Sequence, residues 1–171
     1  MAWTRGVALA LAGLWLGLLF ASWISATASF AAVNRVLREE RPELLAKLAP
    51  VAPDDRVLVL RHLASEANRW MFSRWAVVQL CVACALVLAA WPAAGWPRAL
   101  AIAAAAIAVV QLPLGSSIEA LGRSIDFVPR PLPADLGRRF GLLHAAFVLL
   151  DLLKGVVLGT CAVVLARLPL K

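Results

Sequence analysis

The stretch FGLLHAAFVLLDLLKGVVLGTCAVVLARL, residues 140–168, decides the fold class of this chain. An α-helix needs about 20 apolar residues to cross a bilayer, so this stretch predicts a membrane-spanning helix. Asp151 and Lys154 lie near its middle, three residues apart. Because charge is costly inside a bilayer, an ionisable residue in a spanning helix indicates a site with a partner.

Apolar runs of similar length occur elsewhere in the chain, which is 63% hydrophobic and only 16% charged. Its mean hydropathy is +0.84, and soluble domains are only about half apolar. Four spans are expected, at residues 7–33, 75–96, 99–121 and 141–165. We therefore predict an all-α fold, an integral membrane four-helix bundle in which residues 1–171 form a single membrane domain.

The first span has a second interpretation, because residues 1–29 also fit a secretory signal peptide with an A-x-A cleavage site. The apolar character continues to Val33, well past the usual length of a signal peptide. An uncleaved helix is therefore the preferred expectation.

The net charge of +7 is distributed unevenly between the loops. Cytoplasmic loops of membrane proteins carry an excess of Lys and Arg, and most basic residues here lie in the first and third loops. Both termini are therefore expected outside, and the topology accounts for the charge without a nucleic-acid partner. Arg outnumbers Lys 14 to 3, a bias of GC-rich bacterial genomes that favours a bacterial inner (plasma) membrane. The basic residues of the two loops are Arg35, Arg38, Arg41, Lys47, Arg56, Arg61, Arg69, Arg74, Arg123, Arg130, Arg138 and Arg139.

Two further helical patterns occur in the first half of the chain. Apolar residues from Val57 to Met71 recur at helical spacing, with polar residues opposite. They predict an amphipathic helix in the first cytoplasmic loop, at the membrane surface or continuous with the second span. The first span carries small residues at spacings of three to four, a pattern that lets helices pack closely. These residues are Ala21, Ser25, Ser29 and Ala32.

Asp151 and Lys154 are near neighbours on a helix, and His144 lies on nearly the same stripe. One interpretation is a buried ion pair that sets helix register or docks a subunit; the other is a proton or ion pathway. The pair neutralises itself without a mobile ion, which favours the first. We expect the face from His144 to Lys154 to point into the bundle or a partner.

Several polar residues are expected at the cytoplasmic ends of the spans, where a bundle would bring them into one polar mouth together with His144. A lipid headgroup or small solute could bind there, although solvated helix ends explain such residues equally well. The residues of this mouth are Asn34, Arg35, Glu66, Arg69, Glu119 and Arg123.

Cys81 and Cys84 form a C-x-x-C motif inside the second span. A four-helix membrane protein with this motif resembles the vitamin K epoxide reductase and disulfide-forming quinone reductase group. Such enzymes use a second cysteine pair, whereas only Cys161 remains here, and the motif falls in the reducing cytoplasmic half. Packing of small apolar residues is the preferred interpretation.

The segment RRFGLLHAAFVLLDLLKGVVLG, residues 138–159, resembles the last helix of a four-span family. This domain-of-unknown-function family includes transmembrane protein 205, and its first helix is dotted with polar residues, like ISATASFAAVNRVL here. Asp151 departs from the neutral polar residue expected at its position. The resemblance implies a fold and a membrane location but no catalytic residues.

The sequence lacks phosphate loops, zinc-type Cys/His clusters and hydrolase motifs. We therefore predict no cofactor, no metal site and no catalytic residue. The expected function is that of an accessory or interaction subunit, or of a protein that handles a lipid or small solute. Its expected partners are the lipid bilayer and another membrane protein or a second copy. The alternatives are a thiol or quinone oxidoreductase using Cys81 and Cys84 and a small proton-coupled transporter.

Overall fold

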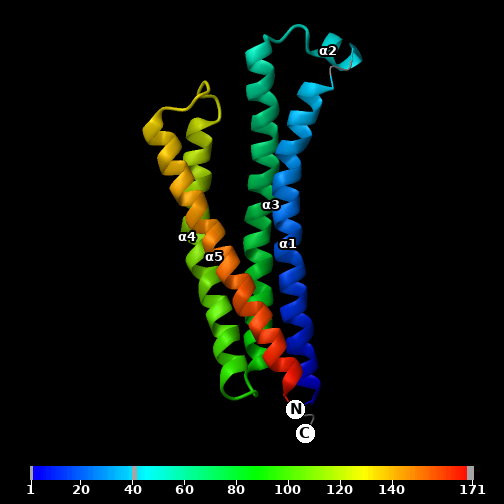
Figure 1. Ribbon diagram of the computed structural model, residues 1–171, viewed down its shortest axis with the longest axis vertical. Coiled ribbons are helices and arrows are strands. Elements are labelled where there is room, and N and C mark those ends of the chain that lie inside the picture. The colour runs from blue at the N-terminus through cyan, green and yellow to red at the C-terminus, as the bar shows by residue number, and fades with distance from the viewer. Residues whose placement is uncertain (1, 40–41, 169–171) are drawn as a thin grey trace.

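The computed structural model describes residues 2–39 and 42–168, and the described residues are almost entirely helical. Four long helices carry the fold, and the short helix α2 lies in the first loop (Figure 1). Their bounds are α1 Ala2–Arg38, α2 Pro42–Leu48, α3 Pro53–Ala90, α4 Trp96–Ile125 and α5 Ala134–Arg167. The predicted all-α class is confirmed.

The long helices form two hairpins, α1 with α3 and α4 with α5, that pack into one bundle. α1 contacts both α3 and α5, and α4 contacts the same two helices. The start of α1 and the end of α5 lie together at one end of the bundle (Figure 1). There the Arg5 side chain donates a hydrogen bond to the carbonyl oxygen of Leu168, joining the two helices.

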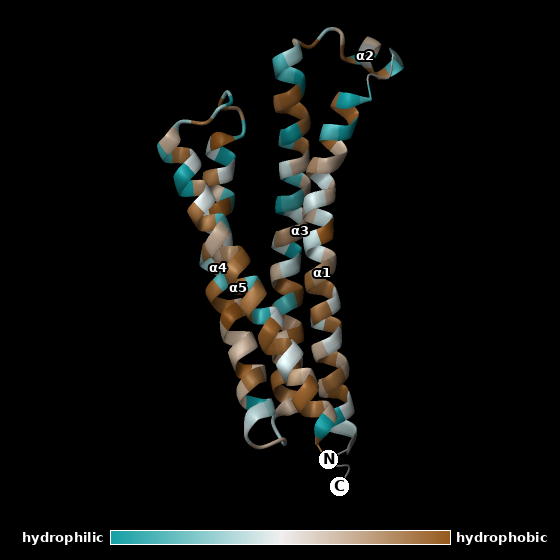
Figure 2. Cartoon of the chain, viewed as in Figure 1, coloured by the Kyte–Doolittle hydropathy of each residue, from teal (hydrophilic) through white to brown (hydrophobic). Residues whose placement is uncertain are grey.

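All four long helices are long and apolar enough to cross a membrane, and together they identify a multi-pass membrane protein. Apolar residues dominate the end of the bundle that holds the termini, whereas hydrophilic residues concentrate toward the opposite end (Figure 2). At 1.5 Å per residue, a helix of 37 residues such as α1 is about 55 Å long. It therefore exceeds the hydrocarbon layer of a bilayer, which is about 30 Å thick.

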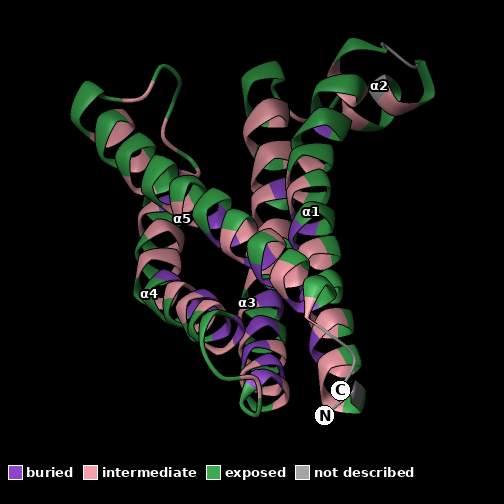
Figure 3. Cartoon of the chain, turned by 60° about the horizontal axis from the view of Figure 1, so that its bottom comes forward, coloured by how far each residue is buried: buried purple, intermediate pink, exposed green. Residues whose placement is uncertain are grey.

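The core is concentrated in the half of the bundle nearest the termini. Helix α4 presents Ala101, Ala104 and Ala108 to its neighbours, and these small side chains allow close backbone approach. The larger side chains Trp15, Leu86 and Leu158 are fully buried opposite them. Toward the other end the two hairpins diverge (Figure 1), and in α5 the buried positions begin only at Asp151 (Figure 3).

Helix boundaries differ from the predicted spans at two places. Helix α3 ends at Ala90, and a turn follows at residues 91–95, so the predicted second span ran past the helix end. Gly95 has a φ of 82°, a left-handed backbone conformation for which glycine has no Cβ penalty. Residues 53–90 form one continuous helix, so the segment from Val57 to Met71 continues into the second span, one of the two arrangements expected. The structure does not confirm that this segment is an amphipathic helix at a membrane surface.

The small-residue stripe of the first span does not pack inside the bundle. Ala21, Ser25 and Ala32 are exposed, and α1 instead buries Ala8, Ala12, Trp15, Leu19 and Ser22. Ser29 is half-buried, and its hydroxyl donates to Asn68 Oδ1 of α3 at 2.9 Å.

Candidate functional site: a buried polar centre

Lys154 is the only lysine buried among the described residues, and its side chain is fully enclosed. Its ammonium group donates to three oxygen atoms: Asp151 Oδ1 at 2.8 Å, Gln111 Oε1 at 2.6 Å and Gln79 Oε1 at 2.5 Å. An ammonium has three N–H donors, so each has an acceptor. The cation is therefore fully solvated by protein groups.

The carboxylate of Asp151 is surrounded in the same way. Its Oδ1 atom also accepts a bond from Gln111 Nε2 at 2.8 Å, and its Oδ2 atom accepts one from Trp23 Nε1 at 3.0 Å. Trp15 Nε1 donates to Gln79 Oε1 at 3.4 Å. We call these six residues, Trp15, Trp23, Gln79, Gln111, Asp151 and Lys154, the buried polar centre.

The buried polar centre joins all four long helices at one level. Helix α1 supplies the two tryptophans, α3 and α4 supply one glutamine each, and α5 supplies the ion pair. No buried side-chain nitrogen or oxygen atom of the described residues lacks a hydrogen-bond partner. Such saturation stabilises one register of the four helices.

The predicted pairing of Asp151 with Lys154 is present, but His144 does not share their environment. Its side chain is exposed and stacks on Phe140, with ring centroids 6.1 Å apart. The physical reason is the divergence of the hairpins (Figure 1), because the face of α5 that is buried from Asp151 onward is uncovered at residue 144. The expectation that the whole face from His144 to Lys154 points inward is correct only from Asp151 onward.

A second polar group links α3 to the end of α4. Arg69 forms a bidentate pair with Asp126, at 2.7 Å to Oδ2 and 2.8 Å to Oδ1, and also contacts Glu66 Oε1. Arg123 donates to two carboxylates, from Nη1 to Glu66 Oε1 at 2.7 Å and from Nη2 to Glu119 Oε1 at 2.9 Å. His62 Nδ1 lies 2.9 Å from Asp126 Oδ2. We call these six residues, His62, Glu66, Arg69, Glu119, Arg123 and Asp126, the α3–α4 cluster.

This cluster contains four residues of the predicted polar mouth, Glu66, Arg69, Glu119 and Arg123. The other two, Asn34 and Arg35, are exposed on α1 and contribute nothing to it within the described part of the chain.

Sequence reasoning missed Asp126, the residue that follows the last turn of α4 and accepts bonds from both His62 and Arg69. Burial acts to raise the pKa of Asp126, but the hydrogen bonds from Arg69 and His62 outweigh it and lower that pKa. Helical periodicity does not extend to a residue beyond the helix end, so the role of Asp126 is visible only from the packing of α3 against α4.

All three cysteines are free thiols. Cys81 and Cys84 are exposed and free, while Cys161 is buried with its Sγ atom 3.7 Å from the carbonyl oxygen of Pro97. The exposed faces of α3 that carry Cys81 and Cys84 lie outside the bundle core. This arrangement offers no thiol relay between the described cysteines.

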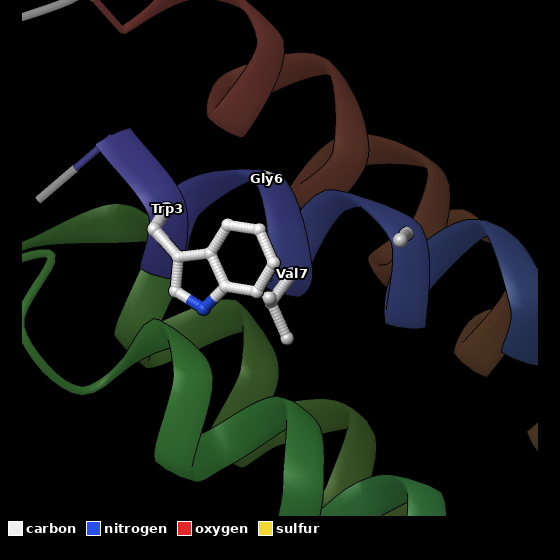
Figure 4. A pocket seen from close by; sticks show the side chains of 4 residues that line it. Trp3, Gly6 and Val7 are labelled. Carbon is white, nitrogen blue, oxygen red and sulfur yellow. The ribbon is translucent and has the colours of Figure 1, made fainter.

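A shallow apolar hollow lies near the start of α1, lined by Trp3, Gly6, Val7 and Ala10 (Figure 4). It holds about 530 Å³ and is open to one side. All four lining residues are apolar, so the hollow has no side-chain group for acid–base or metal chemistry.

No family model, curated protein or solved structure matches the chain. The resemblance of the last helix to the transmembrane protein 205 family therefore stays a prediction.

Proposed function

We propose that this chain is a membrane protein without catalysis of its own, whose function is to bind another transmembrane helix through the outer face of α1. The bound helix belongs to a second copy or to a different membrane protein for which this chain is an accessory subunit. In this proposal the buried polar centre holds the bundle in one arrangement, and α1 presents the binding face.

One observation carries the proposal. Gly13, Gly17, Ala21 and Ser25 recur every four residues on α1, and all four are exposed. A Cβ atom added at Gly13 or Gly17 would meet nothing within 4 Å, so the bundle itself does not use this face. Small residues at this spacing let transmembrane helices approach closely, as in GxxxG pairs, and such pairing is a common basis of helix association in lipid.

The two alternative functions lack comparable support. Transport through the buried polar centre would need a mobile proton or ion, but the three donors of Lys154 and both carboxylate oxygens of Asp151 are bonded to protein groups. A thiol relay would need a second cysteine pair in addition to Cys81 and Cys84, and the one remaining cysteine, Cys161, is buried.

We further propose that the protein resides in a bacterial inner membrane with both termini outside. The support is the charge distribution, since the first and third loops carry most of the basic residues. A reporter that works only in the cytoplasm should be active when it is fused after residue 50 or after residue 130, and a reporter that works only outside should be inactive at both positions. The reverse result at both positions would contradict the proposed orientation.

Crosslinking tests the proposed helix-binding face. A Ser25→Cys variant, prepared in a background without the three native cysteines, is treated in native membranes with a lipid-soluble bifunctional thiol reagent. We expect a discrete adduct, whose mass shows whether the bound helix belongs to a second copy or to another protein.

Bulky substitutions supply the matched comparison. Gly17→Leu fills the contact face and should abolish the adduct, because leucine keeps the backbones apart. Gly141→Leu makes the same change at an exposed glycine of α5, where a Cβ also meets nothing within 4 Å, and should leave the adduct intact. The proposal is contradicted if both variants keep the adduct or if both lose it.

A further inference from the structure

Three side chains with metal-ligating atoms meet where the end of α4 reaches α3. They are His62, Glu66 and Asp126, and their ligand atoms all lie within 4.8 Å of one another. The side chains of His62 and Glu66 are 31% and 37% exposed, so an ion can approach from their side, whereas that of Asp126 is 9% exposed. In a tetrahedral zinc site with bonds of about 2.0–2.2 Å, ligand atoms lie roughly 3.4 Å apart. Small side-chain rotations would therefore bring the three ligand atoms to the separations found around a zinc ion.

The donor set suits a divalent transition metal. One imidazole nitrogen and two carboxylate oxygens correspond to a three-ligand zinc site with a fourth position open to water. His62 and Glu66 are four residues apart on α3, so one helix face holds both ligands in a fixed relation. Asp126 adds the third ligand from the other hairpin.

The guanidinium of Arg69 is the cation that lies between the two carboxylates of this group. Its Nη1 atom contacts both Glu66 Oε1 and Asp126 Oδ2. A metal ion would have to take Asp126 Oδ2 from that nitrogen and replace the proton shared between Asp126 and His62 Nδ1. Arg69 would keep its second bond, from Nη2 to Asp126 Oδ1 at 2.8 Å, and would therefore not be left without a partner.

The guanidinium groups of the α3–α4 cluster have more than one carboxylate partner each. The cluster contains three carboxylates, two guanidinium groups and one histidine. Arg123 has Glu119 as a partner at 2.9 Å, so it can release Glu66 to a metal without losing its ion pair.

We propose that His62, Glu66 and Asp126 form a zinc-type divalent metal site that links α3 to the end of α4, and that Arg69 competes with the ion. The ion also joins the two hairpins at the end where they diverge.

Titration of the purified full-length chain in mild detergent with Zn²⁺ tests this site, with Co²⁺ as a spectroscopic probe of the ligands. We expect saturable binding of one ion per chain. His62→Ala removes a direct ligand, and it should weaken binding at least as much as loss of an outer-shell partner does, about 10- to 100-fold. His144→Ala removes the only other histidine and is the matched control, with unchanged affinity expected.

A second pair of variants tests the competition. Arg69→Gln removes the competing cation and should raise the Zn²⁺ affinity, whereas Arg123→Gln should change it less because Arg123 does not contact Asp126. Circular dichroism and gel filtration check that each variant is folded. Absence of Zn²⁺ binding, equal affinity of the two histidine variants, or a lower affinity of Arg69→Gln would overturn the proposal.

Discussion

The buried polar centre and the α3–α4 cluster are built from similar groups but differ in what surrounds them. In the first, Lys154 is fully enclosed and Asp151 is 3% exposed. In the second, the side chains of Arg123 and Glu66 are 52% and 37% exposed. Water can replace a lost partner of Arg123 or Glu66, but it cannot do so in the centre. Within the cluster the side chains of Arg69 and Asp126 are only 10% and 9% exposed, so the contrast applies to the Arg123–Glu66 pair. An ion pair should therefore be indispensable in the centre and nearly dispensable between Arg123 and Glu66.

The largest effect is expected from Lys154→Met. The substitution keeps the apolar stem but removes the ammonium, which leaves the carboxylate of Asp151 buried without its counter-ion. Removing one member of a buried pair costs about 3–5 kcal/mol. Unfolding in mixed micelles with increasing denaturing detergent measures the loss. A change as small as that of Arg123→Met in the exposed cluster would contradict the contrast between the two regions.

An intermediate effect is expected from Gln111→Leu. The glutamine accepts from Lys154 and donates to Asp151, so leucine leaves both charges with one partner fewer. Loss of such a buried partner costs about 1–3 kcal/mol. Gln111→Glu, assayed beside it, keeps the acceptor but adds a buried negative charge. If Gln111→Leu is neutral in the same micelle assay, the glutamine is not needed to solvate the pair.

A smaller effect is expected at Gly122, which lies beneath Arg69. A Cβ atom there would approach Arg69 Nη2 to 3.1 Å, so the guanidinium must shift. Alanine in a helix is otherwise favoured over glycine by about 0.5–1 kcal/mol. We expect Gly122→Ala to gain less stability than the control Gly141→Ala, where a Cβ meets nothing within 4 Å. Equal gains would mean that the Arg69–Asp126 pair tolerates the shift without loss.

The last expected effect concerns pH and Asp126. Because its pKa is lowered in the folded protein, the carboxylate contributes stability above its unfolded pKa of about 3.9. That contribution is lost as the pH falls through the folded pKa. The difference in stability between the wild type and Asp126→Asn should therefore be present at neutral pH and fade in acid. A difference that is constant from pH 7 to pH 3 would show that charge on Asp126 is not responsible.

The sequence was sufficient for features that depend on local pattern. Hydropathy identified four spans, and the spacing of three residues identified Asp151 and Lys154 as a pair. Gln79 and Gln111 could not be assigned to that pair, because they come from two other helices and have no shared spacing with it. A lone glutamine inside an apolar span was the only available signal.

Features that depend on how the hairpins pack could not be predicted. His144 shares a helical stripe with Asp151, but periodicity does not show at which residue this face of α5 becomes buried. The small residues of α1 predicted close packing, but not that the bundle would bury the opposite face. Asp126 lies beyond a helix end, where no period applies.

A double-mutant cycle on Lys154 and Asp151 tests the central claim most directly, that the buried polar centre fixes the bundle through mutual compensation. The account predicts that Lys154→Met and Asp151→Leu are each strongly destabilising, because each leaves one buried charge. The double variant should recover most of the stability, since an apolar pair replaces a buried ion pair at little cost. Destabilisation of the double variant by the sum of the two single effects would contradict the account.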